Sequence, residues 1–368
     1  MLFATVVIVW GACPHATSAA QDAASPAQRP ALLPATLAWE TRLEPLPVAP
    51  AAHDEARVYV PLEDGALVAL DRATGVQVWR MPATGSSTPL VEAGRVFVPG
   101  AGSLAALEGA TGRHLWRVRV EGLEETASAA VAGSTIVVLT DRGLAALRVE
   151  DGGLLWAWAL PDAASTGTVT AGAGAVFVTH PAGVAAIDLG DGTLRWQRSL
   201  AGVAGTPKLA GDRLLVGTAD RSLAALSTAS GDLAWRWRLG GAFVGAAVRD
   251  EVVYVVALDA LLRAVRLDGG NQVWRRELPT RPVAPPVVRG GTIVLAGNDP
   301  VLATFDAGTG MPVARHVEPG DLLGPPLVAP EDGAAGPAGA NDGVTIVLLF
   351  RDGRLVGLTR EAPAEPTP

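Results

Sequence analysis

The sequence predicts an all-β fold, an eight-bladed β-propeller, and three observations lead to this prediction. A unit of about 40 residues recurs along the 368-residue chain, each unit contains four short β-type runs without a helical period, and the two chain ends hold complementary parts of one more unit. A unit of this size cannot bury both of its faces alone. The units must therefore stack, either in an open solenoid or in a closed ring, and the complementary ends favour the ring.

Tryptophans mark the phase of the repeat. Seven of the ten tryptophans follow one another at separations of 40, 37, 40, 40, 39 and 39 residues, and they are Trp39, Trp79, Trp116, Trp156, Trp196, Trp235 and Trp274. The next position in phase is Ala314. The period covers nearly the whole chain, so we expect one domain despite its length.

Each unit has the same internal order. A β-branched run such as 95–98 is followed by a turn and an alternating run such as 104–107, and a glycine turn then leads into the tryptophan strand. A further run, such as 206–209, precedes the β-branched strand and completes four strands. The glycines that we expect to supply a positive φ in the turns are Gly75, Gly112, Gly152, Gly192, Gly231, Gly269 and Gly310.

The chain ends are expected to close the ring. The C-terminal unit, 344–359, stops before any tryptophan strand, and 37–42 at the other end is a tryptophan strand with nothing of its unit before it. Pairing of these two segments would remove open sheet edges, which invite aggregation. The sequence therefore predicts a propeller over 37–360 and a disordered tail over 361–368.

The N-terminus reads as an export signal. Residues 2–12 are apolar but too few to span a membrane, and small residues follow at 18–20, so we assign 1–20 to a signal peptide and 21–36 to a flexible tether. The mature chain is therefore expected to be exported. Cys13 after Gly11-Ala12 resembles a lipoprotein attachment site, although Trp10 and Pro14 depart from that pattern. The cysteine is either lipidated, which would be the only membrane anchor, or removed with the signal.

Composition disfavours several function classes. The 29 Lys and Arg residues against 37 Asp and Glu residues leave a net charge of −8, which argues against binding nucleic acid. One cysteine excludes an intrachain disulfide and a CxxC zinc site, and the five histidines have no metal-ligand spacing. Asp71 and Asp306 occupy repeated turn positions, where a carboxylate caps the turn. We therefore predict no catalytic, cofactor-binding or metal-binding residue.

The pattern Ala69-x-Asp71-x-x-Thr74-Gly75-x-x-x-Trp79 resembles the tryptophan-docking motif of the pyrroloquinoline-quinone (PQQ) enzyme repeat family. Among eight-bladed members, the segments 252–274, 312–315 and 352–360 are similar to the BamB family, propeller lipoproteins of the outer-membrane β-barrel assembly machinery. A Pro/Gly/Ala-rich insertion at 330–343 departs from that family. The loop that the resemblance matches to the family's partner contacts, 200–207, contains no acidic residue, so that docking site does not carry over.

The resemblance implies that the seven periodic tryptophans stack between blades as structural residues. It also implies a non-enzymatic envelope scaffold that uses propeller loops to bind a protein, such as the barrel-assembly core subunit, as a monomeric ring. A PQQ-dependent oxidoreductase and a glycan- or peptide-binding propeller are the alternatives. Candidate partner contacts off the tryptophan period are Trp158, Trp237 and Phe243, for which ordinary inter-blade packing is the other interpretation. The acidic segment 121–125 is either a solvated connection or a contact for a basic partner.

Overall fold

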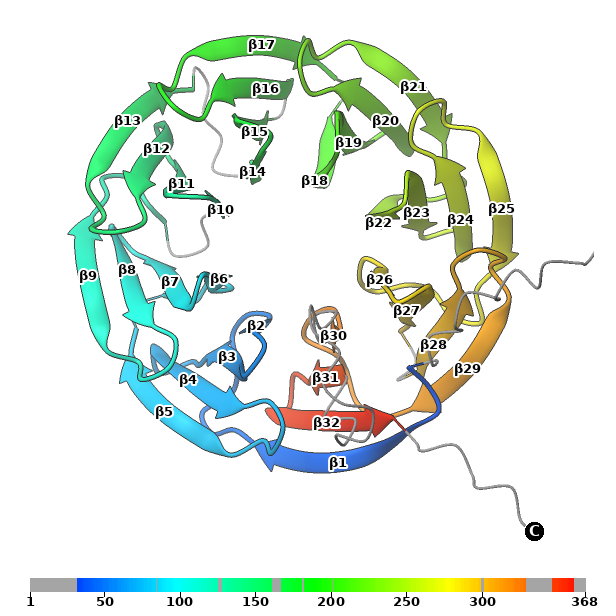
Figure 1. Ribbon diagram of the computed structural model, residues 1–368, viewed down its shortest axis with the longest axis horizontal. Helices are drawn as coiled ribbons and strands as arrows, with labels where there is room; N and C mark the ends of the chain where they lie inside the picture. The colour runs from blue at the N-terminus through cyan, green and yellow to red at the C-terminus, as the bar shows by residue number, and fades with distance from the viewer. Residues whose placement is uncertain are drawn as a thin grey trace, which may run out of the picture. The chain divides into compact units, whose positions relative to one another are not determined.

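The computed structural model describes residues 32–83, 85–124, 128–160, 167–180, 182–200, 202–298, 301–328 and 346–360. They belong to one compact unit, Ala31–Pro368. This unit consists of eight antiparallel four-stranded sheets arranged around a ring (Figure 1), so the predicted all-β eight-bladed propeller is confirmed. In the described part of the chain no helix is long and apolar enough to cross a membrane.

We number the blades in chain order and give their strands from the ring centre outward. Blade 1 contains β2 (Ala52–His53), β3 (Arg57–Pro61), β4 (Ala66–Asp71) and β5 (Gln77–Pro82). Blade 2 contains β6 (Leu90–Glu92), β7 (Arg95–Gly100), β8 (Ser103–Glu108) and β9 (His114–Arg119). Blade 3 contains β10 (Ala129–Ala132), β11 (Thr135–Thr140), β12 (Gly143–Arg148) and β13 (Leu154–Ala159). Blade 4 contains β14 (Val169–Gly172), β15 (Ala175–His180), β16 (Gly183–Asp188) and β17 (Leu194–Ser199).

The second half of the ring repeats this order. Blade 5 contains β18 (Val203–Ala210), β19 (Arg213–Thr218), β20 (Ser222–Ser227) and β21 (Leu233–Arg238). Blade 6 contains β22 (Phe243–Arg249), β23 (Val252–Ala257), β24 (Leu261–Arg266) and β25 (Gln272–Glu277). Blade 7 contains β26 (Val287–Arg289), β27 (Thr292–Ala296), β28 (Val301–Asp306) and β29 (Pro312–Val317). Blade 8 contains β30 (Leu327–Val328), β31 (Ile346–Leu349), β32 (Arg354–Arg360) and β1 (Ala35–Arg42).

Burial follows the position of a strand within its blade. The two middle strands of each blade are buried on both faces, as in β11, because neighbouring blades cover both sides of every sheet. Outer strands instead alternate between exposed and buried residues, as in β5. Apolar clusters lie between successive blades; one of them joins Val60 and Val68 of blade 1 to Val347 and Leu355 of blade 8. The core is thus a ring of inter-blade layers.

The ring closes through the two ends of the described unit. Strand β1 pairs antiparallel with β32 from Ala35 opposite Arg360 to Arg42 opposite Arg354, as the sequence predicted. Leu33, before the strand, is only 1% exposed and belongs to an apolar cluster with blades 7 and 8. The predicted tether therefore extends too far: packing against blade 7 and sheet pairing begin before residue 37.

Two sequence-based details differ from the structure. In blade 6 the turn glycine with a positive φ is Gly270, not Gly269, because the turn accommodates its left-handed residue one position later. The expected loop 200–207 is largely strand, since β18 begins at Val203 and pairs with β19 through a bulge.

Adjacent blades are joined by a recurring contact between a tryptophan and a turn. Each of the seven periodic indoles donates a hydrogen bond of 2.7–3.2 Å from Nε1 to a backbone carbonyl of the next blade. The indole also lies against the turn glycine of that blade, whose φ is between +69° and +76°. A Cβ on any of these seven glycines would lie 2.3–2.8 Å from the indole, so glycine serves both the backbone conformation and the close approach.

The residue opposite each tryptophan on the neighbouring strand is small. It is alanine in six blades and Gly357 opposite Trp39 in blade 8. Blade 7 differs: Ala314 stands at the tryptophan position and faces the fully buried Thr304. The indole there would have to reach a turn between β32 and β1, and no such turn exists because the chain ends meet at that point. Leu33 belongs to the same cluster as Ala314 at this junction.

Candidate functional site

The strands nearest the ring centre form a pocket of about 620 Å³ between blades 5, 6 and 7. In Figure 1, β18, β22 and β26 are the innermost strands of these three successive blades. The lining is mainly apolar and includes Phe243, Pro285 and Pro286, together with Thr206 and Lys208, the only lysine of the chain. Lys208 is exposed and is the only charged residue among the residues that line this pocket. The arrangement suits an apolar segment with an acidic or carbonyl group.

Phe243 is held in this pocket by its surroundings. Its ring packs with the apolar cluster between blades 5 and 6, and a Cβ on Gly217 would lie 2.3 Å from it. The preceding turn is fixed by Asp259, which accepts a hydrogen bond of 2.9 Å from the backbone N–H of Gly240. Phe243 therefore presents a preformed, half-buried surface at the centre of the ring.

Asp259 is itself paired with Arg263 inside blade 6. Both side chains are nearly buried, and two hydrogen bonds of 3.1 and 2.5 Å join the guanidinium to the carboxylate. Burial acts to raise the pKa of the Asp259 carboxyl, but hydrogen bonding and the charge of Arg263, with the backbone donors, hold that pKa below its usual range. This pair was not among the predicted residues, although an Asp in the β23–β24 turn with an Arg four residues later on β24 was its signal.

The central pocket does not fit a calcium–quinone centre. Such a centre needs carboxylate and amide oxygens around the metal. The residues lining this pocket include no carboxylate, and the described residues contain no group of three His, Cys, Asp or Glu side chains placed to hold a metal. We therefore derive no chemistry through a quinone.

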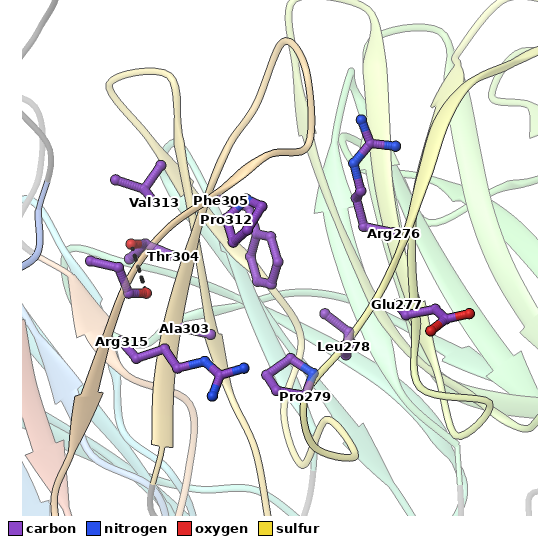
Figure 2. A pocket seen from close by; sticks show the side chains of 11 residues that line it. Arg276, Glu277, Leu278, Pro279, Ala303, Thr304, Phe305, Pro312, Val313 and Arg315 are labelled. Atoms are coloured by element: carbon purple, nitrogen blue, oxygen red, sulfur yellow. Dashed lines mark hydrogen bonds between the residues drawn. The ribbon is translucent and has the colours of Figure 1, made fainter.

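A second pocket, of about 460 Å³, lies on the outside of the ring between blades 6 and 7. Figure 2 shows Phe305 and Pro312 at its middle, with Arg276 and Glu277 from β25 on one side. Arg276 donates a hydrogen bond of 2.7 Å to the carbonyl of Thr309, and Thr304 donates one of 3.3 Å to the carbonyl of Ala314. The pocket is thus an inter-blade groove beside the blade that lacks the tryptophan.

Two of the three candidate partner contacts lie on outer strands. Trp158 on β13 and Trp237 on β21 are each half-buried and pack against the apolar cluster that follows their blade. Trp158 also lines a groove on the perimeter. The structure thus places Phe243 at the ring centre and the two tryptophans on its outside, so the three residues do not form one site.

The remaining sequence-based candidates are dispersed. Glu121 of the acidic segment pairs with Arg142 at 3.0 Å on the exposed surface, whereas Glu125 lies outside the described residues. Asp71 and Asp306 accept hydrogen bonds from backbone N–H groups in their own turns, as expected of turn carboxylates. Cys13, with the predicted signal peptide and tail, also lies outside the described residues.

Comparison with solved structures shows the same ring in proteins of different function. BamB from Moraxella catarrhalis is 18% identical, with a TM-score of 0.66 over 90% of this chain and 99% of that protein. The quinohemoprotein alcohol dehydrogenase from Comamonas testosteroni is 14% identical, with a TM-score of 0.66 over 90% of this chain and 78% of that one. The computationally designed protein Ika8 is 16% identical, with a TM-score of 0.70 over 87% of this chain and 98% of that one. At these identities the likeness concerns the fold.

Sequence comparison is more specific. No curated protein matches the chain. A family model, described as outer membrane protein assembly factor BamB, matches residues 31–181, 180–310 and 239–362, which together cover the whole ring. With its tryptophan joints and its closure by the chain ends, this protein belongs to the family of the outer membrane protein assembly factor BamB.

Proposed function

We propose that this protein is a non-enzymatic scaffold of the cell envelope that binds a protein partner in outer-membrane protein assembly. The observation that carries the proposal is the family match over all eight blades. The proposed location is the periplasm or the periplasmic face of the outer membrane, with Cys13 as lipid attachment site. The proposed partner is the core subunit of the barrel-assembly machinery.

The chemistry of the central pocket supports a binding role. A preformed aromatic side chain beside a cation and two prolines suits recognition of a polypeptide segment, and aromatic residues are frequent hot spots of protein interfaces. Phe243 is the residue we assign to partner contact there.

Affinity purification from a detergent-solubilised envelope tests the proposal. The tagged protein, expressed with its own leader, should recover the barrel-assembly core subunit, and Phe243→Ala should reduce that recovery. Leu233→Ala, which removes an exposed leucine from an outer strand, is the matched control and should leave recovery unchanged. Recovery of cytoplasmic proteins alone would overturn both the export and the scaffold proposals.

A PQQ-dependent oxidoreductase is the second candidate, favoured by the fold shared with a quinohemoprotein dehydrogenase. A ligand present at a hundred times its Kd stabilises a protein by about 2.7 kcal/mol. Adding PQQ with calcium should therefore raise the melting temperature if the oxidoreductase function is correct, with calcium alone as control. We expect no rise, because the central pocket offers no carboxylate to the metal.

A further inference from the structure

One outer strand differs from the other seven in charge. All eight outer strands lie within the described residues, and β13, with the sequence Leu-Leu-Trp-Ala-Trp-Ala, is the only one of them without a charged side chain. The others each carry at least one, namely Glu40 on β1, Arg80 on β5, Arg117 on β9, Arg195 on β17, Arg236 on β21, Arg275 on β25 and Arg315 on β29. Charged residues on an edge strand discourage pairing with another strand. This protection is missing from blade 3.

The difference is sharpest at the position after the docking tryptophan. Four blades have arginine there, and blade 7 has Arg315 at the equivalent position after Ala314. Arg80 pairs with Asp64, and Arg236 pairs with Asp220. Blade 3 has the small residue Ala157 there, and this residue lines an open groove.

The open space is an apolar groove of about 570 Å³ between blades 2 and 3. Its apolar lining includes Val118, Val120, Leu147 and Leu154. Leu154 is 65% exposed and Leu155 on the same strand is 41% exposed, so this part of the perimeter shows apolar side chains to solvent.

The edge of β13 also offers backbone groups. Within its four-stranded sheet β13 pairs only with β12, so its outer N–H and C=O groups have no strand partner among the described residues. An extended peptide can satisfy such an edge by adding a strand, with main-chain hydrogen bonds giving affinity and pockets for alternate side chains giving specificity.

Charge at the rim defines the occupant further. Glu121 and Arg142 at the groove are paired with each other, but the guanidinium of Arg119, also at the groove, has no hydrogen-bond or ion-pair partner in the described part of the chain. An acidic side chain at one end of the bound segment would complement this guanidinium.

We propose that blade 3 binds an extended segment of a partner protein as a fifth strand on β13, with alternate aliphatic side chains in the groove and an acidic residue against Arg119. The proposal deepens the scaffold function and rests on it only in that the ring binds a polypeptide. It adds a contact on the perimeter, at Ala157, to the one that we assign to Phe243 in the central pocket.

Fluorescence polarisation with the full mature protein tests this site. The probe is a labelled peptide, Glu-Val-Thr-Val-Thr-Val-Thr amide, and the controls are the same peptide with alternate backbone nitrogens methylated and the same peptide with Gln for Glu. We expect saturable binding of the probe and no binding of the methylated peptide. The Gln peptide should bind the wild type more weakly than the probe does. The Arg119→Gln variant should bind the Gln peptide as well as the wild type does, because the ion pair is already absent. Ala157→Arg, which restores the side chain found in five other blades, should weaken binding about tenfold or more.

Gln197→Arg is the matched control, because it places the same side chain at the same position of blade 4. Thermal melting checks that both variants fold, which we expect since both positions are exposed. Absence of binding to the wild type, or equal binding to Ala157→Arg, would overturn the proposal. If the wild type binds no peptide but forms a dimer in analytical ultracentrifugation, and Ala157→Arg abolishes that dimer, the proposal would be wrong and β13 would instead mediate self-association. If the peptide does not bind but affinity purification recovers the envelope partner, the scaffold function is supported and the strand site is not. If the peptide binds but the envelope partner is not recovered, only the strand site is supported.

Discussion

Replacing Trp39 by alanine should weaken the pairing of β1 with β32 in blade 8, the strand pair that closes the ring without a covalent turn between its two strands. The indole is 9% exposed, donates a hydrogen bond of 3.0 Å to the Arg72 carbonyl, and lies between Gly75 of blade 1 and Gly357 of its own blade. Large aromatic residues cost about 3–5 kcal/mol when truncated to alanine in a core. We expect a loss in this range, because the two facing glycines leave no side chain that could fill the cavity.

Urea unfolding followed by tryptophan fluorescence measures this loss, and hydrogen exchange locates it. In Trp39→Ala the amides of β1 and β32 should exchange faster than in the wild type, since their pairing alone closes the ring. Trp39→Phe keeps most of the packing and removes only the hydrogen bond, so it should cost about 0.5–1.5 kcal/mol.

Trp196→Ala is the comparison within the ring. It removes the same type of joint between blades 4 and 5, but a covalent turn joins β17 to its neighbour β16, and neither strand belongs to the β1–β32 pair. Exchange at β1 and β32 should therefore stay at the wild-type rate. Removal of the chain up to Thr41 should have a stronger effect than Trp39→Ala, because it exposes the edge of β32 and leads to aggregation. A truncated protein as soluble and as thermostable as the wild type, or unchanged exchange in Trp39→Ala, would refute the role assigned to β1.

Four further predictions follow from the joints and sites described above. Gly192→Ala should cost about 1–3 kcal/mol in urea unfolding, because φ is +76° and the new Cβ would lie 2.7 Å from an indole; Gly211→Ala, with a positive φ but open space, should cost less. Ala314→Trp should lower the melting temperature, since the position has no turn to dock against. Asp259→Asn should lower the free energy of unfolding by about 1.5–3 kcal/mol at pH 7. Because folding lowers the pKa of the Asp259 carboxyl, the stability difference between wild type and variant is fully present above the unfolded-state pKa of about 3.9, and it disappears as the pH falls through the folded-state pKa. Cys13→Ala should move the protein from the membrane fraction to the soluble periplasmic fraction, and a lipid-free mature N-terminus at residue 21 in the wild type, found by mass spectrometry, would contradict the anchor.

The sequence was sufficient to predict the ring because its signals are local and repeated. Each tryptophan, turn glycine and facing alanine recurs with the period, and the end segments 37–42 and 344–359 are recognisable as parts of one blade. The sequence shows that alanine replaces the tryptophan at position 314, but it does not explain why. The explanation depends on the place in the ring where β1 and β32 meet. The central pocket could not be predicted for the same reason: its lining comes from the inner strands of three blades, and β18 and β22 among them contain bulges.

The perimeter site lies between these cases. The uncharged run 154–159 is visible in the sequence. That it is exceptional becomes clear only when it is compared with the outer strand of every other blade. That comparison requires the register that pairs Trp156 with Ala146 and leaves Ala157 on the open side. A substitution of arginine by alanine in a repeat is a difference in shape as well as in charge.

Every tryptophan joint points the same way around the ring, from one blade to the turn of the blade after it, and this gives the circle a direction. A blade inserted or duplicated among the first six brings a tryptophan that can dock on the turn of the next blade and a turn on which the tryptophan of the preceding blade can dock. Both joints therefore form without any further change in sequence. An addition after blade 7 finds no donor at Ala314 and separates Leu33 from the cluster that it completes. Changes in blade number within this architecture should therefore accumulate ahead of blade 7, and the junction of the chain ends should stay fixed as the boundary from which the repeats are counted.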